Sequence, residues 1–565
     1  MKKIFIYILL IIPNIFIAQQ KKDSVKTEVI EVTRSYTPTV QDAYKLAINP
    51  DSIKVIEKKI PVSYRIQSVP VASTFQPEKG RMSQFQFVRH NENQYSSFAS
   101  LAVGNHTNIN AEAFVNYPVS DKLDAGVYVK HRSSQGDKNS QLINPYTHTK
   151  VDALLKYTQK KSQWNLDLGY LLRTHQFSPN LKIVTPSFPV IEETLYKEKR
   201  QQNIFNFNAG GKFTDFFVKD IQLNFQNFWD PYDNTENILN FQSTLNFPIG
   251  ETQIHSGIKA DMVSGTAFEK NINIPAIEKN YQNYSLGILP SFNYTNENLD
   301  VKLGFKLFYQ NSNTNYKNIQ FFPDVTANFN LIYEKLSVYG VLNGDIHQTS
   351  NMKLSLNNPY FVPMEIFPEL MPLELYGGIR GSFSSAFSYD VKMGFRQMKN
   401  HPFYQTRAIY NYIPYGIVYD DLKQSFFATD LNVGVSKKLD FKFNFTYYQN
   451  NPEHLDKAFY MPDYILRSVI LFHPTPKLDI DLSLFNYSKR PIEFENVLDV
   501  YRKSLEAFTD LNAEIRYHIN KNFTGFIQAN NILNKDYEIF YAYPVEKLQI
   551  LGGVMYKFDF SDKNN

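Results

Sequence analysis

The sequence contains no cysteine and only two tryptophans. Without cysteine there can be no disulfide bond, no thiol nucleophile and no cysteine-based metal site. After the first twenty residues it also lacks any apolar run near the roughly 18 residues that a transmembrane helix needs, which argues against a helical membrane protein. The 59 basic and 55 acidic side chains leave a net charge of only +4, so no nucleic-acid partner is indicated.

The start of the chain has the layout of a secretory signal peptide. Lys2 and Lys3 form a positively charged start, and the apolar run Ile4–Ile12 follows. The run is short for a membrane span and has no stop-transfer flank, so a permanent anchor is the less favoured alternative. We therefore expect residues 1–18 to be removed, with cleavage after Ala18. Because no cysteine follows that bond, a lipid anchor at this site is excluded.

Aromatic residues are abundant although the chain is polar on average. It carries 46 phenylalanines and 38 tyrosines, with a mean hydropathy of −0.37. This combination is typical of strands in which lipid-facing and water-facing positions alternate. Strict alternation of apolar and polar residues is clearest in the segments that start at Trp164, Leu299, Leu439 and Leu478. A period of two predicts β-strands, because a helix would scatter these residues around its axis.

The strands follow one another as hairpins. Several begin alike after a short polar turn, at Leu123, Leu299, Leu336, Leu439 and Leu478. We count about 22 strand segments before the end of the chain. Short turns alternate with long connections, which are Phe177–Arg200, Ser350–Met371, His401–Lys423, Asn451–Asp463 and Arg490–Arg502.

Short turns on one side and long loops on the other are the arrangement of outer-membrane barrels. We therefore predict an all-β protein, a transmembrane antiparallel β-barrel of about 22 strands over residues 94–560, with a C-terminal tail at 561–565. The turns would be periplasmic and the loops extracellular. The alternative is a soluble multi-sandwich or propeller, whose strands rarely show such long clean alternation.

Glycines and one proline bear on the closure of the barrel. Gly126, Gly169, Gly304 and Gly434 recur on the side expected to face the lumen, where a missing side chain lets the sheet curl. Pro290 interrupts a strand, and a closed barrel has no edge strand to accept it. We expect a local bulge there.

The last strand carries a family resemblance. Asn530–Tyr537 reads N-N-I-L-N-K-D-Y, similar to a turn of the form N-L-x-N-K-x-Y, and Leu548–Phe558 ends in G-x-x-Y-x-F. This resembles the C-terminal end of TonB-dependent receptors. The resemblance implies that the terminal aromatic residues Tyr556, Phe558 and Phe560 form the signal recognised by the barrel-assembly machinery.

A second resemblance lies near the start of the mature chain. Thr27 precedes a segment similar to the one with which such receptors engage TonB; it comprises Glu28, Val29, Ile30, Glu31, Val32 and Thr33. In that interpretation the segment pairs as an added strand with TonB. The alternative is an ordinary strand of the N-terminal arm.

The chain departs from that family in what precedes the barrel. Such receptors have a folded plug of well over a hundred residues, whereas residues 19–93 are shorter and are broken by several prolines. We expect an extended periplasmic arm, at most a minimal plug. The lumen of so wide a barrel must then be filled by this arm, by inward-folded loops or by a partner chain.

The function that these features imply is the uptake of a ligand across the cell outer membrane. The alternative is a plugless barrel that acts as a structural subunit of an outer-membrane complex. The expected partners are outer-membrane lipids, the barrel-assembly machinery, and either TonB or a separate plug subunit. An enzyme is not expected: only Asp345 and His347 suggest a base, and no histidine spacing indicates a metal site or cofactor.

Overall fold

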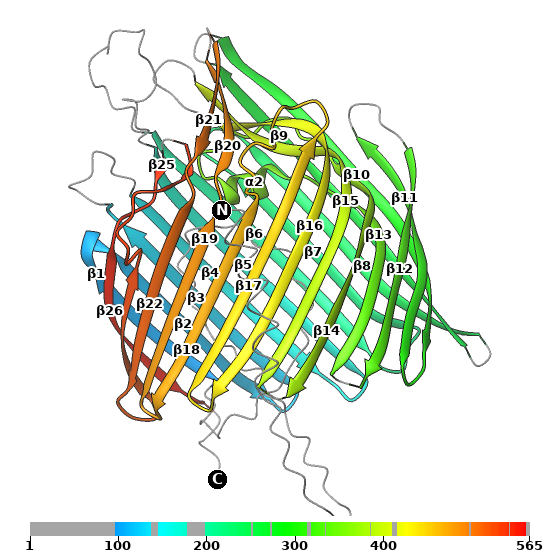
Figure 1. Ribbon diagram of the computed structural model, residues 1–565, viewed down its shortest axis with the longest axis horizontal. Helices are drawn as coiled ribbons and strands as arrows, with labels where there is room; N and C mark the ends of the chain where they lie inside the picture. The colour runs from blue at the N-terminus through cyan, green and yellow to red at the C-terminus, as the bar shows by residue number, and fades with distance from the viewer. Residues whose placement is uncertain are drawn as a thin grey trace, which may run out of the picture. The chain divides into compact units, whose positions relative to one another are not determined.

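The computed structural model describes residues 96–560, apart from 137–144, 178–197, 250–251, 272–273, 313–317, 334, 385, 409–414, 497–498 and 542. The expected signal peptide, the N-terminal arm with its TonB-like segment, and the C-terminal tail therefore lie outside the described residues. Almost all of the described part is β-strand (Figure 1).

The elements follow one another along the chain with these bounds: β1 (Ser97–Gly104), η1 (Asn105–Thr107), β2 (Ile109–Ser120), β3 (Leu123–Ser134), β4 (Tyr146–Thr158), β5 (Ser162–Phe177), β6 (Glu198–Phe213), β7 (Val218–Trp229), β8 (Thr235–Ile249), β9 (Thr252–Asn271), β10 (Ile274–Thr295), β11 (Leu299–Ser312), β12 (Asn318–Ile332), β13 (Leu336–His347), α2 (Asn351–Asn357), β14 (Glu369–Ser384), β15 (Phe387–Ala408), β16 (Tyr415–Ser436), β17 (Leu439–Pro452), β18 (Tyr464–Thr475), β19 (Leu478–Tyr487), β20 (Arg490–Asn496), β21 (Asp499–Leu505), β22 (Phe508–His518), β23 (Phe523–Asn530), β24 (Glu538–Phe540), β25 (Tyr543–Pro544) and β26 (Gln549–Phe558).

The sheet closes on itself into a barrel. Each strand from β1 to β19 pairs antiparallel with the next, β19 continues to β22, and β22, β23 and β26 complete the wall. At the seam β26 pairs with β1, so that Ser97 lies opposite Phe558. The wall therefore has 22 antiparallel strands, and both the predicted fold class and the strand count are confirmed.

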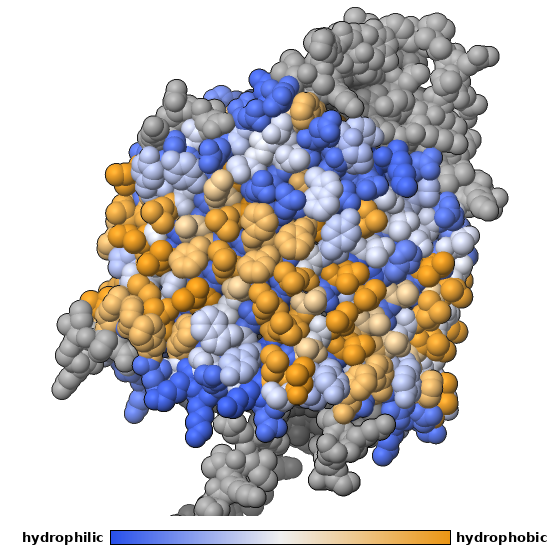
Figure 2. Space-filling view, turned by 180° about the vertical axis from the view of Figure 1, so that it is seen from behind, coloured by the Kyte–Doolittle hydropathy of each residue, from blue (hydrophilic) through white to orange (hydrophobic). Residues whose placement is uncertain are grey.

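Alternation along each strand separates an apolar outer face from a polar interior. On β11, Leu303 and Phe305 are 52% and 40% exposed on the outside, whereas Lys306 points into the lumen and is buried. Figure 2 shows the result on one face of the barrel as a hydrophobic belt, with hydrophilic residues above and below it. The strand starts predicted at Leu123 and Leu299, and the three like them, coincide with the first residues of β3, β11, β13, β17 and β19.

The connections differ in length between the two ends of the barrel, which we call the turn end and the loop end. Aromatic rings gather near the turn end: those of Phe216 and Phe217 lie 4.4 Å apart, and Phe217 stacks on Phe247 at 5.9 Å. Such rings are typical of the membrane–water interface. In outer-membrane barrels the short turns are periplasmic and the long loops are extracellular, so the turn end is the periplasmic side and the loop end the extracellular side.

Two of the predicted long loops are wrong. His401–Lys423 lies mostly within β15 and β16, which extend the wall at the loop end, and Arg490–Arg502 forms most of the β20–β21 hairpin. Both stretches are rich in aromatic and β-branched residues, which favour strands. The β20–β21 hairpin stands outside the ring of 22 and pairs in parallel with the end of β15, where Phe494 lies opposite Thr406.

The bulge predicted at Pro290 is absent. Ile288 pairs with Leu307 and Ser291 with Gly304, so the register of β10 on β11 is the same on both sides of the proline. Two pairs are missing in between, because proline has no N–H to donate to the ladder. A Cβ at Gly304 would lie 2.8 Å from Ser291 Cβ and 2.9 Å from the Pro290 carbonyl oxygen. Glycine is therefore required where the neighbouring strand approaches the proline.

Candidate functional site: a closure of the lumen built from loops

The connection between β13 and β14, residues 348–368, folds into the barrel instead of away from it (Figure 1). It contains the short helix α2, whose residues Met352 and Leu354 are buried. Its hydrogen-bond partners include residues of β5, β6, β8 and β10, as well as residues of β15 and β16. We call this segment the lumen loop. Among the described residues, no helix is both long and apolar enough to cross a membrane.

The start of α2 is held by one buried carboxylate of the wall. Glu236 on β8 is fully buried, and its Oε2 accepts hydrogen bonds from the Ser350 hydroxyl at 2.6 Å and the Met352 backbone N–H at 2.8 Å. Its Oε1 accepts from the Asn351 backbone N–H and the Tyr281 hydroxyl, both at 2.9 Å. A carboxylate is well placed there, since the first N–H groups of a helix have no intrahelical partner.

The end of α2 is held by donors from three other strands. The Leu354 carbonyl oxygen accepts from the Tyr404 hydroxyl at 2.9 Å, and that of Ser355 accepts from the Gln202 amide at 3.0 Å. The Arg173 guanidinium donates to the carbonyl oxygen of Leu356 at 3.0 Å. The last carbonyls of a helix also lack intrahelical partners, so the wall satisfies both termini of α2. Hydrogen-bond acceptors of the wall thus hold the start of α2, and hydrogen-bond donors of the wall hold its end.

An apolar cluster joins the lumen loop to the inner face of the wall and to other loops, and we call it the loop core. Tyr360 of the lumen loop stacks on Tyr543, which precedes β26, with ring centroids 3.5 Å apart and an interplanar angle of 15°. The members of the loop core are Ile204, Phe228, Ile238, Val263, Ala267, Tyr281, Met352, Leu354, Tyr360, Phe361, Ile366, Tyr415, Ile417, Ile492, Leu505, Tyr541 and Tyr543. Burying one large apolar side chain stabilises a fold by about 1.5–3 kcal/mol, so this closure is far from marginal.

Two further hydrogen bonds connect loops at the loop core. The backbone N–H of Tyr460, in the loop between β17 and β18, donates to the Pro491 carbonyl oxygen at 2.8 Å. The Tyr415 hydroxyl donates to the carbonyl oxygen of Tyr541 at 2.5 Å. The lumen loop, the β17–β18 loop, the β20–β21 hairpin and the segment before β26 therefore form one packed unit at the loop end. Inward-folded loops were one of the three expected fillings of the lumen.

Elsewhere the lumen is lined by charged side chains that pair with each other. Asp345 lies 3.3 Å from Lys259 Nζ and 3.1 Å from Lys306 Nζ. Its carboxylate is thus held by two lysines, and this is not the arrangement of an aspartate that orients His347 as a base. Among the described residues no group of acidic and histidine side chains is suited to a metal ion.

The C-terminal aromatic residues lie on the outer face at the turn end. Tyr556 and Phe560 are 41% and 44% exposed, and the rings of Tyr556, Phe558 and Phe560 follow one another at 5.5 and 5.4 Å. Phe560 also meets Tyr117 edge to face at 5.7 Å. These residues are accessible from the membrane, as an assembly signal must be, and that role stays a prediction. Glu28–Thr33 lie outside the described residues.

Glu236, Tyr281 and Asn351 are not predicted from the sequence as parts of the site. Each occupies an ordinary inward position or a loop, and only the fold brings them together. One local signal was available: Ser350 accepts from the Lys353 backbone N–H as a helix N-cap, and serine before a short run of helix-forming residues predicts a helix start.

A closed 22-stranded barrel with an apolar belt, short turns at one end and long loops at the other is an outer-membrane protein with the fold of TonB-dependent receptors. Solved structures with this fold include the siderophore receptor PirA from Acinetobacter baumannii, with a TM-score of 0.61 and 10% identity over 83% of this chain and 81% of that one.

Two more receptors are similar to the same extent. The ferric-catecholate import receptor Fiu from Escherichia coli K12 gives a TM-score of 0.62 and 9% identity over 83% of this chain and 82% of that one. The pyoverdine outer membrane receptor FpvA from Pseudomonas aeruginosa PAO1, bound to pyoverdine, gives 0.61 and 12% identity over 83% and 79%. No protein-family model and no curated protein sequence matches the chain. At these identities the likeness concerns the fold.

Proposed function

We propose that the chain takes up a ligand across the outer membrane through its lumen, and that the loop core is the barrier on the extracellular side. The observation that carries this proposal is the lumen loop, which is held inside the barrel by Glu236 and Arg173 of the wall, whereas the lumen elsewhere contains paired charges. A barrier held by a few hydrogen bonds and apolar contacts over a polar conduit suits a gate. The fold is that of import receptors.

The periplasmic side of the mechanism rests on the N-terminal arm. In this proposal residues 19–93 act as a minimal plug, and Glu28–Thr33 pair as an added strand with TonB, which supplies the energy for opening. The resemblance of Thr27–Thr33 to such a segment supports this part.

Conductance of the purified barrel in a planar lipid bilayer tests the proposal. The intact chain is expected to be closed, and so is a variant without residues 19–90, because the loop core still seals the outer mouth. Replacing residues 351–366 by a short glycine-serine linker in the intact chain should leave the arm as the one seal, and removing both segments should give a large steady conductance. An intact chain that conducts freely would refute a gated uptake path.

A structural subunit of an outer-membrane complex is the second candidate. It is favoured by the same closure, since a barrel sealed by its own packed loops need not open at all. Co-purification with TonB that is lost on deleting Thr27–Thr33 would support uptake. A complex with other envelope proteins that survives mild detergent, unchanged by that deletion and without TonB, would support the structural subunit.

A further inference from the structure

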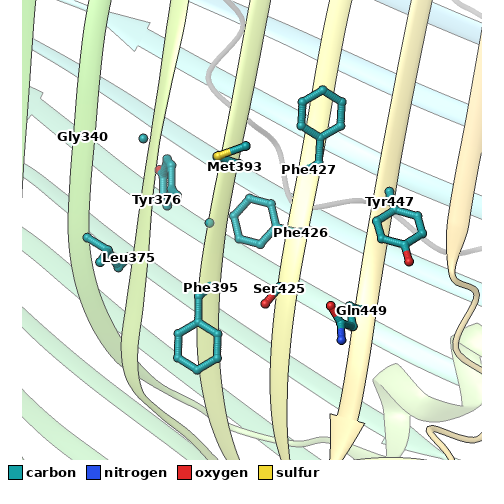
Figure 3. Close-up of a pocket in the computed structure, with 12 residues that line it drawn as sticks. Gly340, Leu375, Tyr376, Met393, Phe395, Ser425, Phe426, Phe427, Tyr447 and Gln449 are labelled. Atoms are coloured by element: carbon teal, nitrogen blue, oxygen red, sulfur yellow. The ribbon is translucent and has the colours of Figure 1, made fainter. Parts of the chain in front are cut away.

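The outer wall carries an apolar groove of about 670 Å³ across β13 to β17 (Figure 3). It is lined by Gly340, Leu375, Tyr376, Gly377, Met393, Gly394, Phe395, Ser425, Phe426, Phe427, Tyr447 and Gln449. Most of these residues point outward: Met393 is 63% exposed, Leu375 53% and Tyr447 47%. The groove is thus on the membrane side of the wall and is separate from the lumen and the loop core.

Small residues at adjacent positions create the groove. Gly340 lies directly opposite Gly377 in the register of β13 on β14, and Ser425 lies opposite Phe395 in that of β15 on β16. A Cβ at Gly340 would meet nothing nearer than 4.0 Å, so the space above this glycine is open. Large side chains border the space, and a sheet face whose glycines leave a channel between bulky neighbours can hold a slender apolar group.

The height of the groove in the wall matches one leaflet of the membrane. On the loop-end side the next outward residues of β15, β16 and β17 are polar, with Lys423 between Gln397 and Asn451. On the turn-end side the apolar belt continues with Ile379, which is 42% exposed. The groove therefore begins directly below the extracellular boundary of the belt and lies within the outer leaflet.

The dimensions of the groove fit a hydrocarbon chain. Five neighbouring strands about 4.8 Å apart make it about 20 Å long. Strands of such barrels are tilted by about 45°, so the groove crosses the membrane obliquely and covers roughly 14 Å of depth. One leaflet contributes about 15 Å of the hydrocarbon core. Water would find few hydrogen-bond partners in so apolar a space, and the lining atoms of an empty channel would lose van der Waals contacts.

We propose that this groove binds one acyl chain of an outer-leaflet lipid, held longer than the lipids around the rest of the belt. Continuity with the lipid-facing belt argues for a lipid as the occupant. The proposal is independent of the proposed uptake function.

Native mass spectrometry of the full chain, extracted from membranes in mild detergent, tests the proposal. The wild-type protein should retain one lipid more than Gly340→Leu, which fills the groove. Gly525→Leu is the matched control: Gly525 is an outward glycine of β23 with no contact closer than 3.9 Å for a Cβ, and this variant should retain as many lipids as the wild type. Ser425→Leu is a second filling variant in case Gly340→Leu does not fold.

A second arm uses a defined lipid. Delipidated protein is returned to vesicles of dimyristoyl phosphatidylglycerol and extracted again, and the wild type and Gly525→Leu should regain one tightly bound molecule that the filled variants lack. Equal retention by all variants would overturn the proposal. A dimer of the wild type that dissociates in Gly340→Leu would also overturn it, since the occupant would then be a second copy of the chain.

Discussion

The hydroxyl of Ser350 donates a hydrogen bond of 2.6 Å to the carboxylate of Glu236, 114 residues earlier in the chain. Glu236 belongs to the wall and Ser350 to the lumen loop, so this bond joins the barrel to its own closure. Both residues are buried, and an unpaired carboxylate at this depth would be costly. The contact therefore indicates where the closure can be loosened with one substitution.

Glu236→Gln should loosen the lumen loop. Each oxygen of the carboxylate accepts from one backbone N–H of α2, so either orientation of a glutamine amide sets an NH₂ group against a backbone donor. The expected cost is about 1–3 kcal/mol. Trypsin cleavage at the exposed Lys353 and bilayer conductance of the arm-deleted chain should both increase.

Glu112→Gln is the control for that substitution. Glu112 is also buried in the lumen, where it accepts from the Tyr128 hydroxyl at 2.5 Å and lies 3.4 Å from Lys130; both of these partners belong to the wall. If both variants increase cleavage and conductance equally, the cause is a change in the wall, and the role assigned to Glu236 is wrong.

The stack of Tyr360 on Tyr543 should couple two loops that are far apart in the sequence. Stacked aromatic pairs contribute about 0.5–1.5 kcal/mol beyond their burial. Tyr360→Ala and Tyr543→Ala, alone and combined, form a double-mutant cycle that can be read by hydrogen exchange of the lumen loop. Tyr360→Phe should retain most of the protection. Strictly additive effects of the two alanine substitutions would show that the rings do not interact.

Phe558→Ala should impair assembly if the C-terminal aromatic residues are the assembly signal. The amount of folded barrel in the outer membrane, measured by heat-modifiable mobility on gels, is expected to fall several-fold. Phe383→Ala is matched, because Phe383 is another exposed aromatic residue at the turn end, 62% exposed, but belongs to β14. A similar loss in both variants would mean that Phe558 serves the interfacial ring of aromatic residues and not recognition.

The β17–β18 loop should respond to pH through His454. Its Nδ1 lies 2.8 Å from Asp420 Oδ1, and this hydrogen bond to the carboxylate raises the pKa of the histidine. A raised pKa means that the stabilisation is fully present below the ordinary value of about 6.5 and is lost as the pH rises through the folded-state pKa. Trypsin cleavage at Lys457 should therefore increase with pH in that window.

His454→Gln should remove that dependence. The loop would remain attached, because Asp420 Oδ2 also accepts from the backbone N–H groups of His454 and Leu455 at 2.8 and 2.7 Å. The effect should be small, since the histidine side chain is 80% exposed. A variant that keeps the pH dependence of the wild type, after correction for the activity of trypsin itself, would show that another group is responsible.

The wall could be predicted from the sequence because its signals are local. Alternation identifies each strand, and polar turns fix the starts of strands such as Leu299 and Leu439. The closure could not be predicted in this way. Glu236 has the pattern of any inward position, α2 is too short to show a helical period, and the partners of the lumen loop come from distant strands. The bulge predicted at Pro290 was wrong for a related reason, because Gly304 on the next strand decides how the proline is accommodated.

The membership of the loop core has a consequence for the order of assembly. Its residues extend from Ile204 on β6 to Tyr543, which precedes the last strand of the wall. The core cannot be completed until the segment that precedes β26 is in place. A newly inserted barrel therefore lacks its complete outer closure until this last segment has docked, whatever the state of the rest of the wall.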